Sequence, residues 1–265
     1  MNILITVLGT LSALGFTGWL GLQVPPKIEP AVAESCETEY ITKLPDNLPA
    51  PVLRYLQTVF EDKIPVVKTA VFHGAPQARI NGIKMRINYQ VFYRFGGDYR
   101  RDMKVGWFGK QLIEGHELYI NGVGKALIAG ETESGPEFEQ AFNISIWSEV
   151  VLMPSLLIQD ERLRWEVVSD NRLKLFVPFH DQTDSLLIDF DPATGLVSRI
   201  EAQRPKNGKL VGWAITPQDW QWINGIYLPT RNPLQWADEK TPWTVWAIDD
   251  IRYNLKVDEK FVLDF

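Results

Sequence analysis

The feature that most constrains the fold is a strict alternation of apolar and mostly polar residues over positions 83–95. Successive side chains of a β-strand point to opposite faces, so this period of two predicts a long strand with one dry face and one mostly wet face. Gly96-Gly97 then turns the chain, and the alternation resumes from Tyr99 to Trp107. The pattern predicts an antiparallel meander. The seven apolar positions are Ile83, Met85, Ile87, Tyr89, Val91, Tyr93 and Phe95.

Asn-Gly pairs occur at four places in the sequence. Both residues tolerate the positive φ angles of tight hairpin turns, so each pair predicts a turn between two strands. The sheet is therefore expected to be long and hairpin-connected. The pairs are Asn81-Gly82, Asn121-Gly122, Asn207-Gly208 and Asn224-Gly225.

Two segments carry the helical period instead. Residues 51–60 have one apolar stripe, and Pro51 suits a first helical position. Ser134-Gly135-Pro136-Glu137 has the form of a capping box, and the apolar stripe that follows ends at Pro154. Together the elements predict an α+β domain with a large antiparallel sheet of about ten strands and two helices packed on one face.

The N-terminal segment, residues 1–26, is expected to be a membrane anchor or a signal segment. Residues 2–24 carry no charged side chain, and roughly 20 such residues span a bilayer. Pro25-Pro26 favours an uncleaved transmembrane anchor, whereas the small-x-small pattern Ala31-Val32-Ala33 keeps a cleaved signal open. Residues 27–47 form a Pro-rich acidic spacer, and residues 48–265 form a single β-rich domain. We expect that domain outside the cytoplasm, on the periplasmic side.

Composition excludes several classes of function. The formal net charge of -6 and pI near 5.2 have the wrong sign for neutralising phosphates, so nucleic acid is not expected as a partner. A single cysteine, Cys36, excludes an internal disulfide framework and a multi-cysteine zinc site. No metal site and no cofactor is predicted.

We expect no enzyme activity, because no catalytic motif is recognisable. Glu114 and His116 lie two apart and could form an acid–base pair, but an exposed hydrophilic strand face explains them better. His180 with Asp181 and Asp184 is better explained by a polar hairpin loop than by a metal site.

Tryptophan is concentrated between positions 213 and 246, where six residues of this type occur. Large amphipathic rings line apolar ligand cavities and membrane-facing surfaces, although ordinary core and cross-strand packing is the simpler explanation. The candidate ligand-binding residues are Tyr89, Tyr93, Trp147, Trp213, Trp220, Trp222 and Trp243.

Two resemblances accompany these patterns. The segments 48–56, 147–157 and 163–166 resemble an uncharacterised bacterial membrane-anchored family that has no established activity. The order of membrane signal, short helix, long one-sided strands and mid-chain helix over residues 48–255 resembles the half-barrel domains of bacterial lipoprotein carriers (LolA/LolB-like). That resemblance implies a curved half-barrel sheet whose concave face holds acyl chains beneath the helices, with no catalytic residue.

Three functions stay open. Non-catalytic binding or carriage of a lipid-like or apolar ligand at a bacterial membrane predicts a cavity lined by the odd-numbered residues of 83–95 and some tryptophans. A structural or protein-interaction module of the cell envelope predicts that the helices fill this space. An unrecognised enzyme predicts His116 or His180 in a cleft beside a carboxylate.

Overall fold

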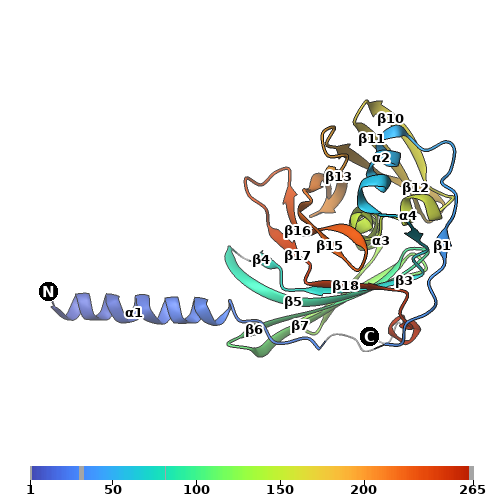
Figure 1. Ribbon diagram of the computed structural model, residues 1–265. Coiled ribbons are helices and arrows are strands. Elements are labelled where there is room, and N and C mark those ends of the chain that lie inside the picture. The colour runs from blue at the N-terminus through green and yellow to red at the C-terminus, as the bar shows by residue number, and fades with distance from the viewer. Residues whose placement is uncertain (1, 30–32, 81, 263–265) are drawn as a thin grey trace.

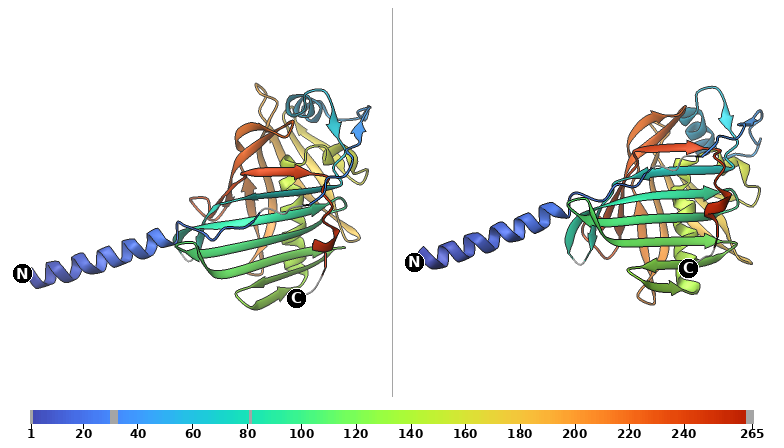
Figure 2. Two further views of the ribbon diagram at one scale, coloured as in Figure 1. Left: turned by 60° about the horizontal axis from the view of Figure 1, so that its bottom comes forward. Right: turned by 90° about the horizontal axis from the view of Figure 1, so that it is seen from below.

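The structure, a computed structural model, describes residues 2–29, 33–80 and 82–262, with side chains described from residue 12 onward. One large, strongly curved antiparallel sheet wraps around a helix (Figures 1 and 2). The α+β class and the large antiparallel sheet agree with the expectation from the sequence. The sheet does not close into a barrel, because its two edge strands are not paired with each other.

The first half of the sheet is a meander built on the alternating segment. The long strand β5 pairs with β6 throughout most of its length, and β6 pairs with β7. The strands of this half are β3 (Thr69–Gly74), β4 (Gln77–Ile80), β5 (Ile83–Arg94), β6 (Asp98–Trp107), β7 (Lys110–Ile120), β8 (Val123–Ile128) and β9 (Glu131–Ser134).

The second half is another meander that returns to the first. Strand β17 pairs with both β16 and β4 and so joins the two halves, while β18 pairs with β3. The strands are β10 (Arg164–Ser169), β11 (Arg172–Phe179), β12 (Gln182–Phe190), β13 (Val197–Lys206), β14 (Lys209–Ile215), β15 (Gln218–Ile223), β16 (Ile226–Trp236), β17 (Thr244–Ala247) and β18 (Asp250–Tyr253).

The main sheet has 16 strands, so the expected number of about ten was wrong. The edge strands explain part of the difference. Every residue of β9 is exposed, and β10 has only one residue that is not exposed. Strands without a buried face lack the apolar alternation from which the sequence pattern detects them.

The helical segment between β9 and β10 crosses the open side of the sheet. It consists of α3 (Pro136–Ser148), the 3₁₀ turn η1 (Glu149–Leu152) and α4 (Leu156–Gln159). The capping box predicted at Ser134 was wrong: α3 follows Gly135, with no side-chain cap, and Ser134 is the last residue of β9, paired with Lys125. Gly135 occupies the N-cap position, so Ser134 lies one residue too early for its side chain to cap the helix.

Helix α2 (Ala50–Val59) lies at one end of the sheet, whereas α3 lies along its concave face (Figure 1). The ring centroid of Tyr55 is 6.0 Å from that of Phe190 and 6.3 Å from that of Trp220. Phe60, just after α2, forms a backbone bridge with Ile226. Phe190 and Ile226 lie at strand ends, whereas Trp220 lies within β15. Helix α2 therefore covers one end of the half-barrel (Figure 1), and the two helices do not share one face as predicted. Both contribute to the same hydrophobic core.

Turn chemistry follows the sequence. Asn121-Gly122, Asn207-Gly208 and Asn224-Gly225 all have positive φ at both residues and connect neighbouring strands. Gly82 also has positive φ, whereas Asn81 lies outside the described residues.

The N-terminal helix α1 (Asn2–Gly21) projects away from the domain (Figure 2). No helix in the described part of the chain combines the length and apolar character needed to cross a membrane. The transmembrane anchor predicted for residues 1–26 is therefore not supported by the structure. Of the alternative cleavage site, Ala31 and Val32 lie outside the described residues.

Part of the predicted spacer is tied to the domain. The short strand β1 (Tyr40–Ile41) pairs with β2 (Ile64–Pro65), and the amide of Cys36 donates to the carbonyl oxygen of Asn254. Near the C-terminus a final 3₁₀ turn, η2, covers Asp258–Lys260.

Candidate functional site

A cavity of about 130 Å³ lies between the concave face of the sheet and the α3–η1 segment. Most of its lining is apolar. An engineered apolar cavity of about 150 Å³ takes up benzene, so this space is large enough for a small ring or a short chain. The lining residues are Phe72, Pro76, Ala78, Ile87, Tyr89, Arg101, Met103, Glu117, Phe142, Ser145, Ser148, Glu149, Val151, Leu152, Arg204, Trp213, Ile215, Asn232, Leu234, Trp243, Thr244, Trp246 and Ile248.

The alternation of β5 and β6 places these side chains. Ile87 and Tyr89 come from the odd-numbered, inward face of β5, and Met103 comes from the corresponding face of β6. A side chain at Gly124 would lie 2.6 Å from the ring of Phe142, so the glycine allows α3 to approach β8 closely. The cavity is thus bounded by the sheet on one side and by α3 and η1 on the other.

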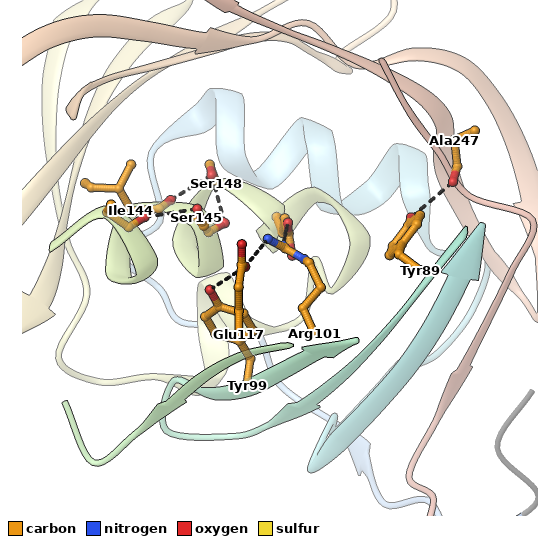
Figure 3. Close-up of polar contacts among 10 residues, drawn as sticks. Tyr89, Tyr99, Arg101, Glu117, Ile144, Ser145, Ser148 and Ala247 are labelled. Atoms are coloured by element: carbon orange, nitrogen blue, oxygen red, sulfur yellow. Dashed lines mark hydrogen bonds and ion pairs between the residues drawn. The ribbon is translucent and has the colours of Figure 1, made fainter. Parts of the chain in front are cut away.

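One wall of the cavity carries a buried charged cluster. The Arg101 side chain lies between two carboxylates: Nη1 donates to Oε2 of Glu117 at 2.8 Å, and Nη2 donates to Glu149. The hydroxyl of Tyr99 also donates to Glu117, at 3.1 Å (Figure 3). Because Glu149 begins η1 and Arg101 and Glu117 belong to β6 and β7, the cluster connects the helical segment to the sheet.

Burial changes the acid–base properties of this cluster. Burial raises the pKa of the Glu149 carboxyl above its ordinary value, and the attraction of Arg101 only partly offsets this effect. Burial opposes the charge of Arg101, but the carboxylates of Glu149 and Glu117 outweigh it and hold the pKa of Arg101 above its ordinary value. Arg101 is therefore charged at every physiological pH.

A second arginine, Arg204 on β13, faces the same cavity in a different way. Its guanidinium carbon lies 4.7 Å from the ring centroid of Trp213 and 5.7 Å from that of Trp236. Burial lowers the pKa of Arg204 to about 10, so the side chain keeps its charge at neutral pH. Its Nε atom is buried and has no hydrogen-bond partner among the described residues.

The structure distributes the seven aromatic candidates over different environments. Tyr89, Trp213 and Trp243 line the cavity. The hydroxyl of Tyr89 donates to the carbonyl oxygen of Ala247 at 3.1 Å (Figure 3). Tyr93 and Trp147 are buried in the core and do not line the cavity.

Trp220 and Trp222 lie away from the cavity. Trp220 packs against Tyr55 and Tyr227, whereas Trp222 is 50% exposed beside Tyr227. Ordinary packing accounts for Tyr93, Trp147 and Trp220. A ligand-binding role for the three aromatic residues that do line the cavity stays a prediction.

The sequence interpretation missed the charged residues of the cavity. Arg101 falls at an inward position of β6, between Tyr99 and Met103, and Arg204 falls two residues after the buried Ala202. A long cation at an inward position of an alternating strand was the available signal, because such residues are buried only when another group compensates for the lost hydration.

The histidines that were considered for catalysis lie elsewhere. His116 is on the opposite face of β7 from Glu117, and its Nδ1 atom is 2.7 Å from Oδ1 of Asp102. His180 is in the β11–β12 turn, with Nε2 3.3 Å from Glu139. Neither lines the cavity. Over the described residues, no three His, Cys, Asp or Glu side chains are grouped so that they could hold a metal ion.

Comparison with known proteins identifies the family. A family model described as "Family of unknown function (DUF6544)" matches residues 39–248. The chain belongs to this family. The expected membership of an uncharacterised family is thus confirmed, and a search of curated proteins finds no match.

Among the solved structures that are similar to the chain are two that cover about four fifths of it. One is a DUF1329 family protein from Desulfovibrio piger ATCC 29098, with 14% identity over 80% of this chain and 95% of that chain, at a TM-score of 0.48. The other is a LolA superfamily protein from Nitrosomonas europaea, with 12% identity over 81% of this chain and 97% of that chain, also at 0.48. The predicted resemblance to LolA-like domains is therefore found, and it says nothing of what this chain binds.

Proposed function

We propose that this protein is a non-catalytic binder or carrier of a lipid-like or apolar ligand and that it works at a bacterial membrane, on the periplasmic side. The observation that supports the proposal is the apolar cavity between the sheet and the α3–η1 segment. Burial of apolar surface there would drive binding at about 25 cal/mol per Å² without any reacting group. A ligand longer than the cavity would extend out of it or displace the helical segment.

The end of the domain next to α1 supports a membrane location. The carbonyl oxygens of Gly21, Leu22 and Val24 accept from the amides of Phe108, Arg86 and Gly109, so the chain at the end of α1 is attached to β5 and to the β6–β7 turn. Exposed apolar side chains surround this attachment and form what we call the apolar rim. The rim consists of Trp19, Val24, Ile83, Trp107, Phe108 and Leu112.

Cations accompany the apolar rim. Lys84, Arg86 and Lys110 are exposed, and none of them forms an ion pair with a described residue. Aromatic rings beside free cations are typical of surfaces that contact anionic lipid head groups. This distribution contrasts with the formal net charge of -6 of the whole chain. We therefore propose that the rim faces the membrane.

The direct test of ligand binding uses the full chain purified from membranes in mild detergent, followed by solvent extraction and mass spectrometry. We expect one co-purified apolar molecule per chain. Met103→Trp should fill the cavity and abolish the co-purification, whereas Lys104→Trp places the same bulk on the outer face of β6 and should retain it. A clean unliganded mass for the wild type, unchanged on incubation with lipids, would favour an interaction module of the envelope instead.

A further inference from the structure

The hydrogen-bonding groups of the cavity are not balanced. Four N–H donors in its lining are buried and have no partner among the described residues: Nε of Arg101, Nε of Arg204, Nε1 of Trp213 and Nε1 of Trp243. One acceptor of the lining, Oδ1 of Asn232, is also buried without such a partner. Arg204 forms no hydrogen bond or ion pair with a described residue, and its guanidinium lies over the rings of Trp213 and Trp236. Buried donors are almost always paired in native proteins, so an excess of four donors over one acceptor needs an explanation.

The two carboxylates of the cavity do not supply the missing acceptors. Arg101 donates to Glu117 and to Glu149, and Tyr99 also donates to Glu117. Formal charges therefore balance in number, two arginines against two glutamates, but both carboxylates are bonded to the same arginine. Arg204 keeps a full charge and a planar set of donors that face the cavity and have no hydrogen-bond partner among the described residues.

An anionic oxygen group fits these donors best. Carboxylate and phosphate oxygens accept from a guanidinium through charge-assisted bonds, which are roughly twice as strong as neutral ones. The indole N–H of Trp213 belongs to the ring on which the guanidinium lies and can only donate. A cationic head group would face a buried like charge and find no free carboxylate.

We propose, building on the proposed function, that the ligand is an amphiphile with an anionic head group, held by Arg204 and Trp213 while its apolar chain occupies the cavity. Arg204 is then the specificity-determining residue. The chemistry is shared by fatty acids and by phosphate-bearing lipids.

The test compares two probes that differ only in the head group. Octanoate is ionised at about pH 7, and octan-1-ol is its neutral counterpart. Isothermal titration calorimetry with the full chain should show octanoate binding about tenfold to a hundredfold more tightly than octan-1-ol, as charge-assisted hydrogen bonds allow. Octyl phosphate as a third probe separates the two sources of anion by its affinity relative to octanoate.

Variants of one strand identify the residue responsible. Arg204→Gln should reduce octanoate affinity to that of octan-1-ol and leave octan-1-ol binding unchanged. Arg204→Lys, which keeps the charge, should retain part of the preference. Arg199→Gln changes an exposed arginine on the same strand, paired with Glu201, and should alter neither affinity. Trp213→Phe, on the neighbouring strand β14, removes the indole N–H donor and keeps an aromatic side chain. It gives a second measurement if Arg204→Gln does not fold.

The outcomes separate the two proposals. The proposal of an anionic head group is overturned if octanoate and octan-1-ol bind equally tightly. It is also overturned if a preference for octanoate survives both Arg204→Gln and Trp213→Phe. Either result leaves the proposed binding of an apolar ligand intact. If none of the three probes binds, the proposed function fails and this inference fails with it.

Discussion

Arg101 is the residue whose loss should affect the fold most sharply, because it is 5% exposed and holds two carboxylates at once. Replacing it with methionine leaves Glu117 and Glu149 buried without their cation. Removing one partner of a buried ion pair costs about 3–5 kcal/mol. We therefore expect Arg101→Met to lower the free energy of unfolding in urea by about that amount.

The neighbouring Arg100 provides the matched control for this prediction. It lies on the opposite face of β6, where it pairs with Asp102 at 2.9 Å in a partly exposed position. Arg100→Met should cost no more than about 1 kcal/mol, the usual value for an accessible pair. Equal losses of unfolding free energy in the two variants would show that the buried cluster stabilises the fold no more than an accessible ion pair does.

Glu149 should give the folded protein a stability that falls as pH rises. Burial raises its pKa in the folded state, so between the unfolded value of about 4.5 and the raised value the folded chain binds more protons than the unfolded chain. Its contribution is complete below the unfolded pKa and is lost as pH rises through the folded pKa. Relative to wild type, Glu149→Gln should therefore become more stable as pH increases over this window in urea titrations.

Glu201 supplies a control of opposite sign. A hydrogen bond from Arg199 lowers its pKa, against a smaller effect of partial burial. Its contribution is present above the unfolded pKa and is lost as pH falls through the folded one. Glu201→Gln should thus become less stable than wild type as pH rises, and slopes of the same sign in both variants would contradict the two assignments.

The aromatic residues of the site could be predicted from the sequence only in part. Alternation placed Tyr89 on the inward face of β5, because strand period alone determines that side. Alternation could not distinguish Tyr89, which borders the cavity, from Tyr93 four residues on, which is packed in the core. That difference depends on how far α3 and η1 extend along the sheet, and this is a property of tertiary packing.

At the scale of elements, the β6–β7 turn carries a feature without a role in the core. Phe108 is 50% exposed at a φ of 47°, and Trp107 donates its indole N–H to the carbonyl oxygen of Gly18 at 3.0 Å. Positive φ is unusual for a bulky residue, and asparagine tolerates it better. Phe108→Asn should therefore keep the turn while removing one ring of the apolar rim.

This substitution tests the membrane contact. In sedimentation with vesicles that contain phosphatidylglycerol, Phe108→Asn should weaken binding of the full chain by roughly tenfold, since burying a phenylalanine contributes about 1.5–3 kcal/mol. Trp222→Asn removes an equally exposed ring far from the rim in sequence and should have no effect. Binding should also weaken with added salt and on phosphatidylcholine alone, because about 1 kcal/mol is expected per cation near an anionic surface.

Elements with a clear period were predictable, and those defined by their neighbours were not. The alternating segment 83–95 became β5, with its last residue outside the strand, and the stripe after Pro51 became α2. Ser134 is of a residue type that often caps helices, but it pairs with Lys125 in β9 and Gly135 takes the N-cap position. Local composition could not show that strand β9 extends as far as Ser134.

At the scale of the whole molecule, the half-barrel depends on two strand pairings between distant segments. Strand β17 pairs with β4 through Thr244 and Val245, and β18 pairs with β3 from Asp250 to Tyr253, so both ladders connect the two meanders. Hairpins are specified by their turns, whereas a pairing across more than half the chain is specified only by the shape of the assembled sheet. The sequence therefore predicted a long hairpin-connected sheet but not the two long-range pairings that bring its halves together.

The same architecture predicts that ligand and stability are linked. A molecule bound between sheet and helical segment contacts the folded chain only, so it should stabilise that chain by mass action. At about 100 times its dissociation constant, octanoate should add about 2.7 kcal/mol to the free energy of unfolding and raise Tm accordingly. Met103→Trp, which fills the cavity from within, should show no such rise, whereas Lys104→Trp should behave like wild type. An equal rise in Met103→Trp would place the ligand at another surface, because the filled cavity could no longer hold it.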